Sequence, residues 1–522
     1  MAISTSLPNF LQPTQGKGLY AGNYLNFLDG DHNQWAQQFL PDVYDKEVEI
    51  YGNRTISGFL KMVSAEMPST SDQIIWLEQG RLHARYTGLA AAYAAATGVA
   101  TFTVPAASTG AGLPTNSQTG TDEGSSNRNI NFRIGQTVMV QREATAGGKG
   151  VGDTIKGVVT AVAASGLNFS MLVYQNATAI TGTVPTGGAA TFTALAYGSE
   201  FAKGTGNFTE KLDPSYSTYQ NSPIIMKEHY AINGSDTGQI GWIEVTSENG
   251  ASGYLWYVKA EHENRLRWED YIEMSMVEGV TNATTATGTA PELQAYRGDG
   301  AGATTTDLAA RGTEGFFAAL QSRGNVYNDL SGDLTSTTAA TPGLDAFDTI
   351  LRQLDKQGSI EENMLYVDRD LSLAFTDMLA AVNSTGNALG TSYGIFNNSE
   401  DMALKLHFNG FRRGSYDFYQ TDWKYLNDFS TRGAFGDIQG VLIPAGTSTV
   451  YDQNLGKNIK RPFLHVRYRA SETDNRKMKS WITGSVGGAY TTDIDEMRMH
   501  YLTERCLITQ GANNFFLFEG VA

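Results

Sequence analysis

The fold is decided by residues 223–279, PIIMKEHYAINGSDTGQIGWIEVTSENGASGYLWYVKAEHENRLRWEDYIEMSMVEG. Apolar and polar side chains alternate from Ile224 to Ile232, and this period of two predicts a β-strand. Asn233-Gly234 is a turn dipeptide, and Gln239 to Val245 is the predicted returning strand. The first half of the stretch therefore predicts an extended hairpin.

A long charged helix is predicted to follow the hairpin. Ser247 or Asn249 can serve as its N-cap, and Gly279 can end it. Roughly thirty residues at about 1.5 Å each form a rod about 45 Å long. Two favourable i,i+4 ion pairs are predicted along it, Glu261–Arg265 and Glu263–Arg267. A rod of this length beside an extended hairpin suits a shell subunit that reaches its neighbours better than it suits a compact enzyme.

The composition indicates a large folded protein with little charge. The 522 residues are enough for about three or four modules, and 41% of them are hydrophobic. Only 18% are charged, below the roughly 25% of ordinary soluble domains, and 57 are glycine. This balance predicts much β structure and extensive subunit contact. The net charge of −16 argues against a general nucleic-acid-binding surface, because neutralising phosphates needs clustered Lys and Arg.

The chain is expected to fold in a reducing cytoplasm. Its single cysteine, Cys506, excludes an intrachain disulfide and a multi-cysteine zinc site. The segment Met1 to Pro8 has neither a basic stretch nor an apolar core, so no secretory signal is expected. The Ala-rich stretch Gly88–Ala100 is too short for a membrane helix.

An inserted β domain is predicted at 98–200, where charge becomes sparse. Nine charged residues are found between Gly98 and Gly198, among many Thr, Ala, Gly, Ser and Val. Short strands separated by turn signals predict a small antiparallel barrel or sandwich on the outer surface. The predicted strands are Gln136–Gln141, Ile155–Val162, Leu167–Tyr174 and Thr191–Thr193.

Residues 1–60 are predicted to be an arm, and residues from about 340 to 480 a compact α/β region. The arm has Gly, Pro and Asn at irregular spacing with aromatic anchors, and packing on its own chain is an equally good interpretation. Strands and amphipathic helices alternate in the α/β region. The predicted elements are helices through Gly312–Ser322 and Leu344–Leu354, a buried strand Met364–Val367, a helix with Leu371 and Phe375, and strands Gly440–Pro444, Phe463–Tyr468, Cys506–Thr509 and Phe515–Glu519.

No catalytic, metal or cofactor-binding residue is predicted. His262-Glu263 begins like a zinc helix but lacks a second histidine four residues on. The Gly147–Gly152 loop lies between predicted strands, which favours a plain loop over a phosphate cradle. Cys506 lies in an apolar strand, which favours a buried, inert thiol.

Three acidic groups have an alternative functional interpretation. Asp29-Gly30-Asp31 is predicted to be a turn rather than a cation site. Asp493, Asp495 and Glu496 are predicted to cap or flank a helix containing Met497 and Met499, rather than to form an acid pair. Asp368 follows a predicted strand, where it could be catalytic in an α/β enzyme, and helix capping explains it without further assumptions.

Positive charge is concentrated after residue 410 and is interleaved with aromatic residues. Stacking on nucleic acid is one interpretation of that pattern. The same region also contains acidic residues, including Asp417, Asp422 and Asp428, and mixed charges with aromatics favour a subunit interface.

The order of these elements resembles the major capsid proteins of tailed double-stranded DNA phages, which have the Hong Kong 97-like fold. Two C-terminal phrases are also similar to phage capsid endings, with a suggestion of the crAss-like group: 479-KSWITGSVGG-488 and 511-GANNFFLF-518. The resemblance implies an α+β fold in this order: N-terminal arm 1–60, start of a peripheral domain 61–97, inserted β domain 98–200, extended loop 201–246, spine helix and peripheral domain 247–339, axial α/β domain 340–480, and return to the peripheral domain 481–522.

The same resemblance implies a structural protein without enzymatic activity or cofactors. It implies self-assembly into hexamers and pentamers of an icosahedral head in the virion, built in the host cytoplasm, which encloses DNA without sequence-specific binding. Portal, scaffold or auxiliary head proteins are the implied further partners, and no membrane is involved. Large aromatics are favoured anchors of interfaces. The predicted interface residues are Tyr230, Trp242, Trp268 and Trp35.

Three alternatives remain from the sequence. An encapsulin-like shell protein shares the fold, and residues 98–200 leave open a virion decoration or glycan-binding protein. An α/β hydrolase with a β accessory domain is the enzyme alternative.

Overall fold

The computed structural model describes residues 66–79, 83, 85–94, 96–103, 132–142, 154–163, 168–174, 191–208, 216–238, 245–246, 252–253, 256–281, 312–335, 343–384, 409–445, 447–452, 457–486 and 491–520. Strands predominate over helices. The chain divides into two compact units, Ile75–Gln220 and the remainder, Met1–Ile74 with Asn221–Ala522.

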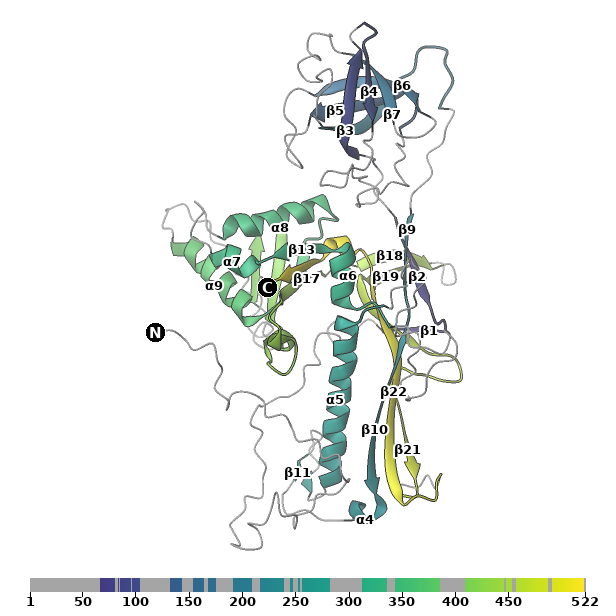
Figure 1. Ribbon diagram of the computed structural model, residues 1–522, viewed down its shortest axis with the longest axis vertical. Helices are drawn as coiled ribbons and strands as arrows, with labels where there is room; N and C mark the ends of the chain where they lie inside the picture. Colours follow the sequence, from purple (N-terminus) through teal and green to yellow (C-terminus); the bar gives the residue numbers. More distant parts are fainter. Residues whose placement is uncertain are drawn as a thin grey trace. The chain divides into compact units, whose positions relative to one another are not determined.

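The unit Ile75–Gln220 contains a closed antiparallel barrel (Figure 1). The barrel confirms the predicted small antiparallel β domain, and it is closed rather than split into two sheets. Its strands follow the order β3-β4-β7-β6-β5-β8. Their bounds are β3 Arg85–Ala94, β4 Val99–Thr103, β5 Gln136–Arg142, β6 Ile155–Val162, β7 Asn168–Val173 and β8 Thr191–Ser199. A separate pair, β2 Ile74–Gln79 and β9 Tyr216–Asn221, carries the chain into and out of this unit.

The Ala-rich stretch supplies the first two barrel strands, which the composition did not indicate. A β-bulge between Tyr86 and Leu89 shifts the alternation of β3, so both side chains are buried. Gly88 lies in the bulge at φ 72°, a conformation that glycine adopts without strain. The compact unit therefore begins at Ile75, upstream of the composition change near residue 98.

The barrel interior is filled with aromatic rings. Phe102 stacks on Phe169 with ring centroids 5.2 Å apart and meets Phe192 edge-on at 5.8 Å. Phe132 closes on Phe169 at 5.0 Å. Phe102, Phe169 and Phe192 alternate along their strands with less buried residues, because successive residues of a strand point to opposite faces. The core is thus independent of the rest of the chain.

The second unit contains a five-stranded sheet organised around one long strand, β22 Glu496–Thr509. On one side, β22 pairs with β10 Ile224–Asn233 over the full length of β10. It also pairs with β21 Lys479–Gly484 and with β20 Leu464–Arg469. β1 Glu66–Ser69 adds parallel to β20. We refer to β10, β22 and β21 as the ribbon.

The ribbon gives β10 a partner that the predicted hairpin did not include. β10 is a strand, as predicted, but its partner among the described strands is β22 from the end of the chain. Asn233-Gly234 leads into a helical turn, α4 Gly234–Thr237, rather than into a two-residue hairpin loop. The predicted returning strand falls largely outside the described residues, and its last residue, Val245, belongs to the short pair β11 Val245–Thr246 and β12 Ser252–Gly253.

The long helix is α5, Trp256–Glu278, and it runs beside the ribbon without a break (Figure 1). It starts later than predicted, because Ser252–Gly253 pairs with β11 and is not helical. It ends as predicted, where the amide of Gly279 donates to the carbonyl of Ser275 at 3.1 Å. Arg265 pairs with Glu269 rather than with Glu261, and Lys259 pairs with Glu263.

The same unit holds a six-stranded mixed sheet in the order β13-β23-β17-β14-β16-β15. Its strands are β13 Asn325–Asn328, β23 Phe516–Glu519, β17 Ile438–Pro444, β14 Glu362–Val367, β16 Tyr416–Asp422 and β15 Asn409–Arg413. Its helices are α6 Phe316–Arg323, α7 Leu330–Thr335, α8 Leu344–Lys356, α9 Arg369–Ser384 and α11 Lys424–Asn427. The β17 strand is buried throughout, which explains its continuous apolar sequence.

The remaining described elements are short. They are the pair β18 Thr447–Asp452 and β19 Lys457–Pro462 and two 3₁₀ turns, η3 Arg432–Ala434 and η4 Ala512–Asn514. Gly511, at φ 60°, lets the chain turn from β22 into η4 and then β23. The chain therefore passes from one sheet to the other within a few residues.

The predicted helix around Met497 and Met499 is wrong. Both residues lie in β22, where they alternate with Arg498 and His500 and pair with β10 and β21. Tertiary pairing on both edges overrides the local capping pattern of the acidic residues. No helix in the part of the chain that the structure describes is long and apolar enough to cross a membrane.

We expect the barrel unit, residues 75–220, to fold on its own, and we expect Phe169 to be important for its stability. Replacing this fully buried side chain, Phe169→Ala, should lower the free energy of unfolding by about 3–5 kcal/mol. Leu172→Ala, on the same strand but half exposed, should change it by less than about 0.5 kcal/mol. Urea denaturation of the excised unit measures both. Equal losses in the two variants would contradict the described barrel interior.

Candidate functional site

A groove with a volume of about 620 Å³ lies beside α5, β21 and β22 in the second unit. Helix α5 provides one wall and the strands the other. We call it the groove. Its lining residues are Glu261, Arg265, Trp268, Met478, Lys479, Ser480, Trp481, Ile482, Met499, His500 and Tyr501.

An aromatic contact fixes the helix against the ribbon at the groove. Trp268 is 2% exposed and its ring lies 5.3 Å from that of Tyr501. The Tyr501 hydroxyl donates to a carboxylate oxygen of Glu261, which lies on the same helix as Trp268. Burial, followed by this hydrogen bond, raises the pKa of Tyr501, so the phenol remains protonated as a donor at neutral pH.

Two of the four predicted interface residues lie near the groove. Trp268 packs inside its own chain, and Tyr230 on β10 is half-buried opposite Met499. Burial and the nearby Glu261 raise the pKa of Tyr230. Trp242 and Trp35 lie outside the described residues. The role of all four in a subunit contact stays a prediction.

The exposed apolar residues of the ribbon are ones that the sequence analysis did not select. Trp481 and Ile482 on β21 are each 39% exposed, and Met478 just before it is 43% exposed. Ile225 on β10 is also exposed. The sequence pattern alone did not identify them, because Trp481 and Ile482 are neighbours in β21 and their side chains point to opposite faces of the strand.

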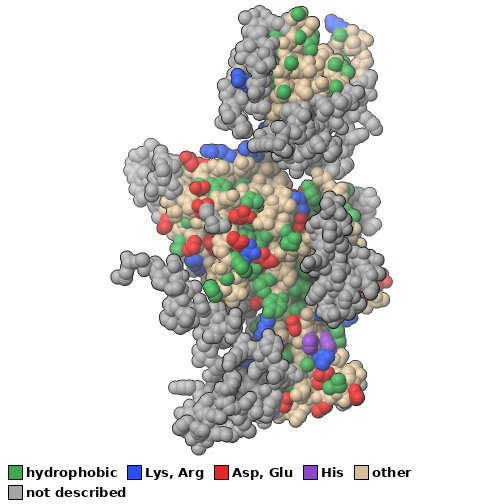
Figure 2. Space-filling model, in the orientation of Figure 1, with side chains coloured by type: hydrophobic (Ala, Val, Ile, Leu, Met, Phe, Trp, Pro, Cys, Tyr) green, Lys and Arg blue, Asp and Glu red, His purple; other side chains and the backbone are tan. Residues whose placement is uncertain are grey.

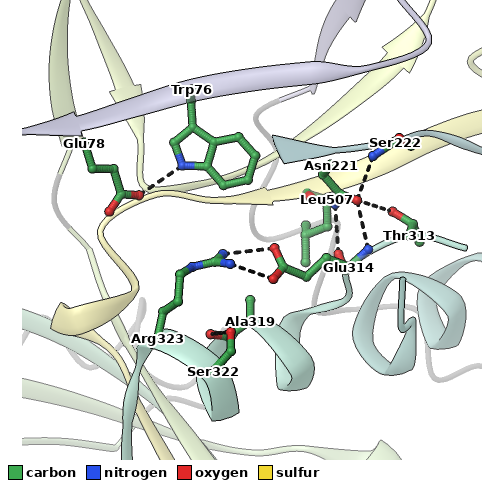
Figure 3. Close-up of polar contacts among 10 residues, drawn as sticks. All are labelled: Trp76, Glu78, Asn221, Ser222, Thr313, Glu314, Ala319, Ser322, Arg323 and Leu507. Atoms are coloured by element: carbon green, nitrogen blue, oxygen red, sulfur yellow. Dashed lines mark hydrogen bonds and ion pairs between the residues drawn. The ribbon is translucent and has the colours of Figure 1, made fainter. Parts of the chain in front are cut away.

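A buried amide holds the start of β10 to the core (Figure 3). The Asn221 side chain donates to the carbonyls of Glu314 at 2.9 Å and Leu507 at 2.7 Å. Its oxygen accepts from Thr313 at 3.1 Å and from the amides of Ser222 and Glu314. The Glu314 carboxylate in turn accepts hydrogen bonds from both terminal nitrogens of Arg323. An amide with all its hydrogen bonds made is a structural joint rather than a reactive group.

A second polar network lies under the β1–β20–β22 part of the sheet. The buried carboxylate of Glu504 forms ion pairs with Arg469 at 3.2 Å and Arg476 at 2.9 Å. The adjacent Arg505 is buried and faces Glu66 at 3.4 Å, and burial lowers its pKa. Buried charges persist where each has a partner, so this network ties β1 to the end of the chain.

Several of the basic and aromatic residues after 410 make contacts within the subunit. Arg413 pairs with Asp348 at 2.6 Å, and Arg412 pairs with Asp417 at 3.4 Å. Trp423 belongs to a buried cluster. These contacts favour internal packing over stacking on nucleic acid.

The described residues contain no cluster suited to hold a metal ion. Within those ranges, three or more His, Cys, Asp or Glu side chains nowhere gather to hold a metal ion. Cys506 is fully buried on β22, and burial raises the pKa of its thiol to about 12. A protonated, inaccessible thiol is a poor nucleophile.

Asp368 has a strongly shifted pKa, and it is a helix cap. Its carboxylate accepts from the amide of Leu371 at 2.7 Å at the start of α9. Burial raises its pKa to about 6, with further contributions from Asp370 and Asp422, while the Leu371 hydrogen bond acts in the opposite direction. The geometry matches the capping interpretation.

Comparisons with known proteins give structural neighbours only. No protein-family model matches the chain, and no curated protein sequence matches it. The chain is similar to phage capsid structures. The capsid of the cyanophage P-SCSP1u is 9% identical, with 62% of this chain and 80% of that chain covered and a TM-score of 0.32. The capsid of a native GTA particle is 8% identical, with 62% and 82% covered and a TM-score of 0.31. A structure from Microbacterium phage Oxtober96 is 9% identical, with 93% and 98% covered and a TM-score of 0.32.

The capping interpretation predicts different outcomes for two substitutions of Asp368. Asp368→Ala removes the cap and should lower the free energy of unfolding by about 1 kcal/mol at pH 7. Asp368→Asn keeps an acceptor oxygen and removes the buried charge, so it should be at least as stable as the wild type at that pH.

The pH profile provides the second measurement. A carboxyl whose pKa rises from 3.8 to about 6 on folding contributes stability at low pH that is lost as pH rises through about 6. Thermal unfolding of Asp368→Asn should therefore depend less on pH between about 4 and 7 than that of the wild type. Identical profiles would show that Asp368 is not buried as described.

Proposed function

We propose that this protein is a major capsid protein that self-assembles into an icosahedral phage head. The observation that supports it best is the ribbon with its helix: an elongated layer that exposes Trp481, Ile482 and Met478 to solvent in the isolated chain. Large apolar groups gathered on one element mark an interaction site. A subunit of a shell covers such groups with its neighbours.

The free edges of the ribbon support the same proposal. Among the described strands, β10 bonds only to β22, and so does β21. Each leaves a row of backbone donors and acceptors along its outer side. In a shell these edges and the groove meet adjacent subunits, and the several interfaces of one subunit are expected to exceed about 2,000 Å² each.

The parts of a Hong Kong 97-like subunit can be assigned on this proposal. Helix α5 is the spine helix, and the five-stranded sheet around β22 belongs to the peripheral domain. The six-stranded sheet with α7, α8 and α9 is the axial domain. Residues 1–60 are the arm, residues 201–246 contain the extended loop, and the barrel is an inserted module for a neighbour or a decoration protein.

The net charge of the chain is consistent with a shell that encloses DNA without binding it tightly. The net charge of −16 disfavours tight contact with phosphates. Several basic residues after 410 are paired with carboxylates of the same subunit, as for Arg413 with Asp348. On this proposal the protein is located in the virion, forms hexamers and pentamers, and meets portal, scaffold or auxiliary proteins during assembly.

The exposed residues of β21 test the proposal. Trp481→Ala and Ile482→Ser should leave the melting temperature of the unassembled subunit nearly unchanged, because both side chains are partly exposed. Each should weaken subunit association by about 2 kcal/mol, roughly thirtyfold, which abolishes most shells in electron micrographs.

Two control variants separate assembly from folding. Leu373→Ala removes an exposed apolar side chain from α9, away from the ribbon, and should assemble normally. Trp268→Ala opens a cavity at a buried position and should lower subunit stability by about 3–5 kcal/mol. Normal shells from both β21 variants would show that the ribbon is not part of a subunit interface. A wild-type protein that forms only a small oligomer would overturn the capsid proposal.

A further inference from the structure

Two histidines face each other across the edge of the ribbon. His229 on β10 and His500 on β22 are directly paired residues of the antiparallel ladder, and their rings stack with centroids 6.4 Å apart. Trp481 is paired with His500 on the other side, with its ring 5.1 Å away and an angle of 14° between the planes. The three rings form one row across β10, β22 and β21. Figure 2 shows histidine side chains together at the surface, beside basic groups.

The groups around this row are mostly cationic. Two residues away along the strands, Lys227 of β10 and Lys479 of β21 lie on one side of the three rings. Arg498 of β22 lies two residues away on the other side. The Lys479 ammonium lies 5.9 Å from the Trp481 ring centre and pairs with Asp474, and Arg498 pairs with Glu496.

Three more charged groups lie near the row, and a hydroxyl contacts it directly. The Glu228 carboxylate accepts from the amide of His229 at 3.2 Å, and Glu261 and Arg265 of α5 line the groove together with His500. Thr483 contacts His500 Nε2 at 2.8 Å. None of the carboxylates named here forms a described ion pair with either imidazole.

We propose that His229 and His500 form a pH-sensitive latch that holds the edge strand β10 on β22 at neutral pH and loosens it in mild acid. With neutral rings, the stacked row adds to the backbone ladder. When both rings are protonated, two cations stand directly opposite each other, and like charges at that position destabilise a strand pair. Imidazole is the side chain that makes this change between about pH 5 and 8.

The direction of the effect agrees with the surroundings of His500. Burial lowers the pKa of this imidazole, and Arg498 and His229 lower it further, while Glu496 acts in the opposite direction. A histidine with a lowered pKa contributes stability above its unfolded pKa of 6.5, and that contribution is lost as pH falls through the folded pKa. β10 is the strand that responds, because β22 is its one described partner.

Hydrogen exchange of the full-length protein, read by mass spectrometry, tests the latch. Protection of peptides covering Ile224–Asn233, corrected for intrinsic exchange rates, is compared at about pH 7.5 and about pH 5.5. In the wild type we expect protection to fall about two- to fivefold in acid, while peptides of β17 in the six-stranded sheet stay unchanged.

Variants decide whether the histidine pair is the cause. His229→Gln should retain most of its protection at the lower pH, and His229→Thr repeats the test with a good strand former. His229→Lys should reduce protection already at neutral pH. His83→Gln, in the barrel unit, should respond to acid as the wild type does. An unchanged wild type, or an equal loss in His229→Gln and His229→Thr, would overturn the latch. The comparison is made on unassembled subunits, so its result does not depend on whether the protein forms a shell.

Discussion

The rest of the second unit depends on the double pairing of β22. Ten successive residues of this strand, Glu496 to Arg505, bond to β10 on one edge, while β21 and β20 share the other edge. A strand paired on both sides has its register fixed, and a slip of one residue would turn every side chain to the wrong face. That register places Tyr501 against Trp268 and sends His500 to the other face, so it sets both the helix contact and the histidine row.

The same strand joins the two sheets into one folding unit. After Thr509 the chain turns at Gly511 and enters β23, which pairs with β13 and β17. The Asn221 amide binds the carbonyl of Leu507 and the segment before α6, so the start of β10 is fixed at the same junction. At the C-terminal end of α5, Glu278 accepts from Tyr425 and Arg432, which belong to the region of the six-stranded sheet. These contacts hold the ribbon and α5 to the rest of the unit.

Much of the fold is predictable from local sequence patterns. The helix α8, the strands β5, β6, β14 and β17, and the cap at Asp368 are predicted from periodicity and capping alone, because each depends on residues close in sequence. The pairing of β10 with β22 is not predictable in this way, because the turn signal at Asn233-Gly234 points to a strand nearby in the sequence, whereas β22 lies more than 260 residues away. The strand at Met497 was misjudged for the same reason: acidic residues suggested a helix start, and two flanking strands impose extended backbone.

By itself, the sequence determined that the chain is a large, sparsely charged, strand-rich protein with a long helix, a separate β module and one inert cysteine. Those properties follow from composition and short-range periodicity. Only the tertiary structure decided that Trp268 is a core residue, that Trp481 and Ile482 are exposed, and that His229 meets His500. Each of these depends on which strands pair and in what register. Pairing of distant strands is set by the burial of a whole sheet face, a sum over many residues that no single stretch of sequence specifies.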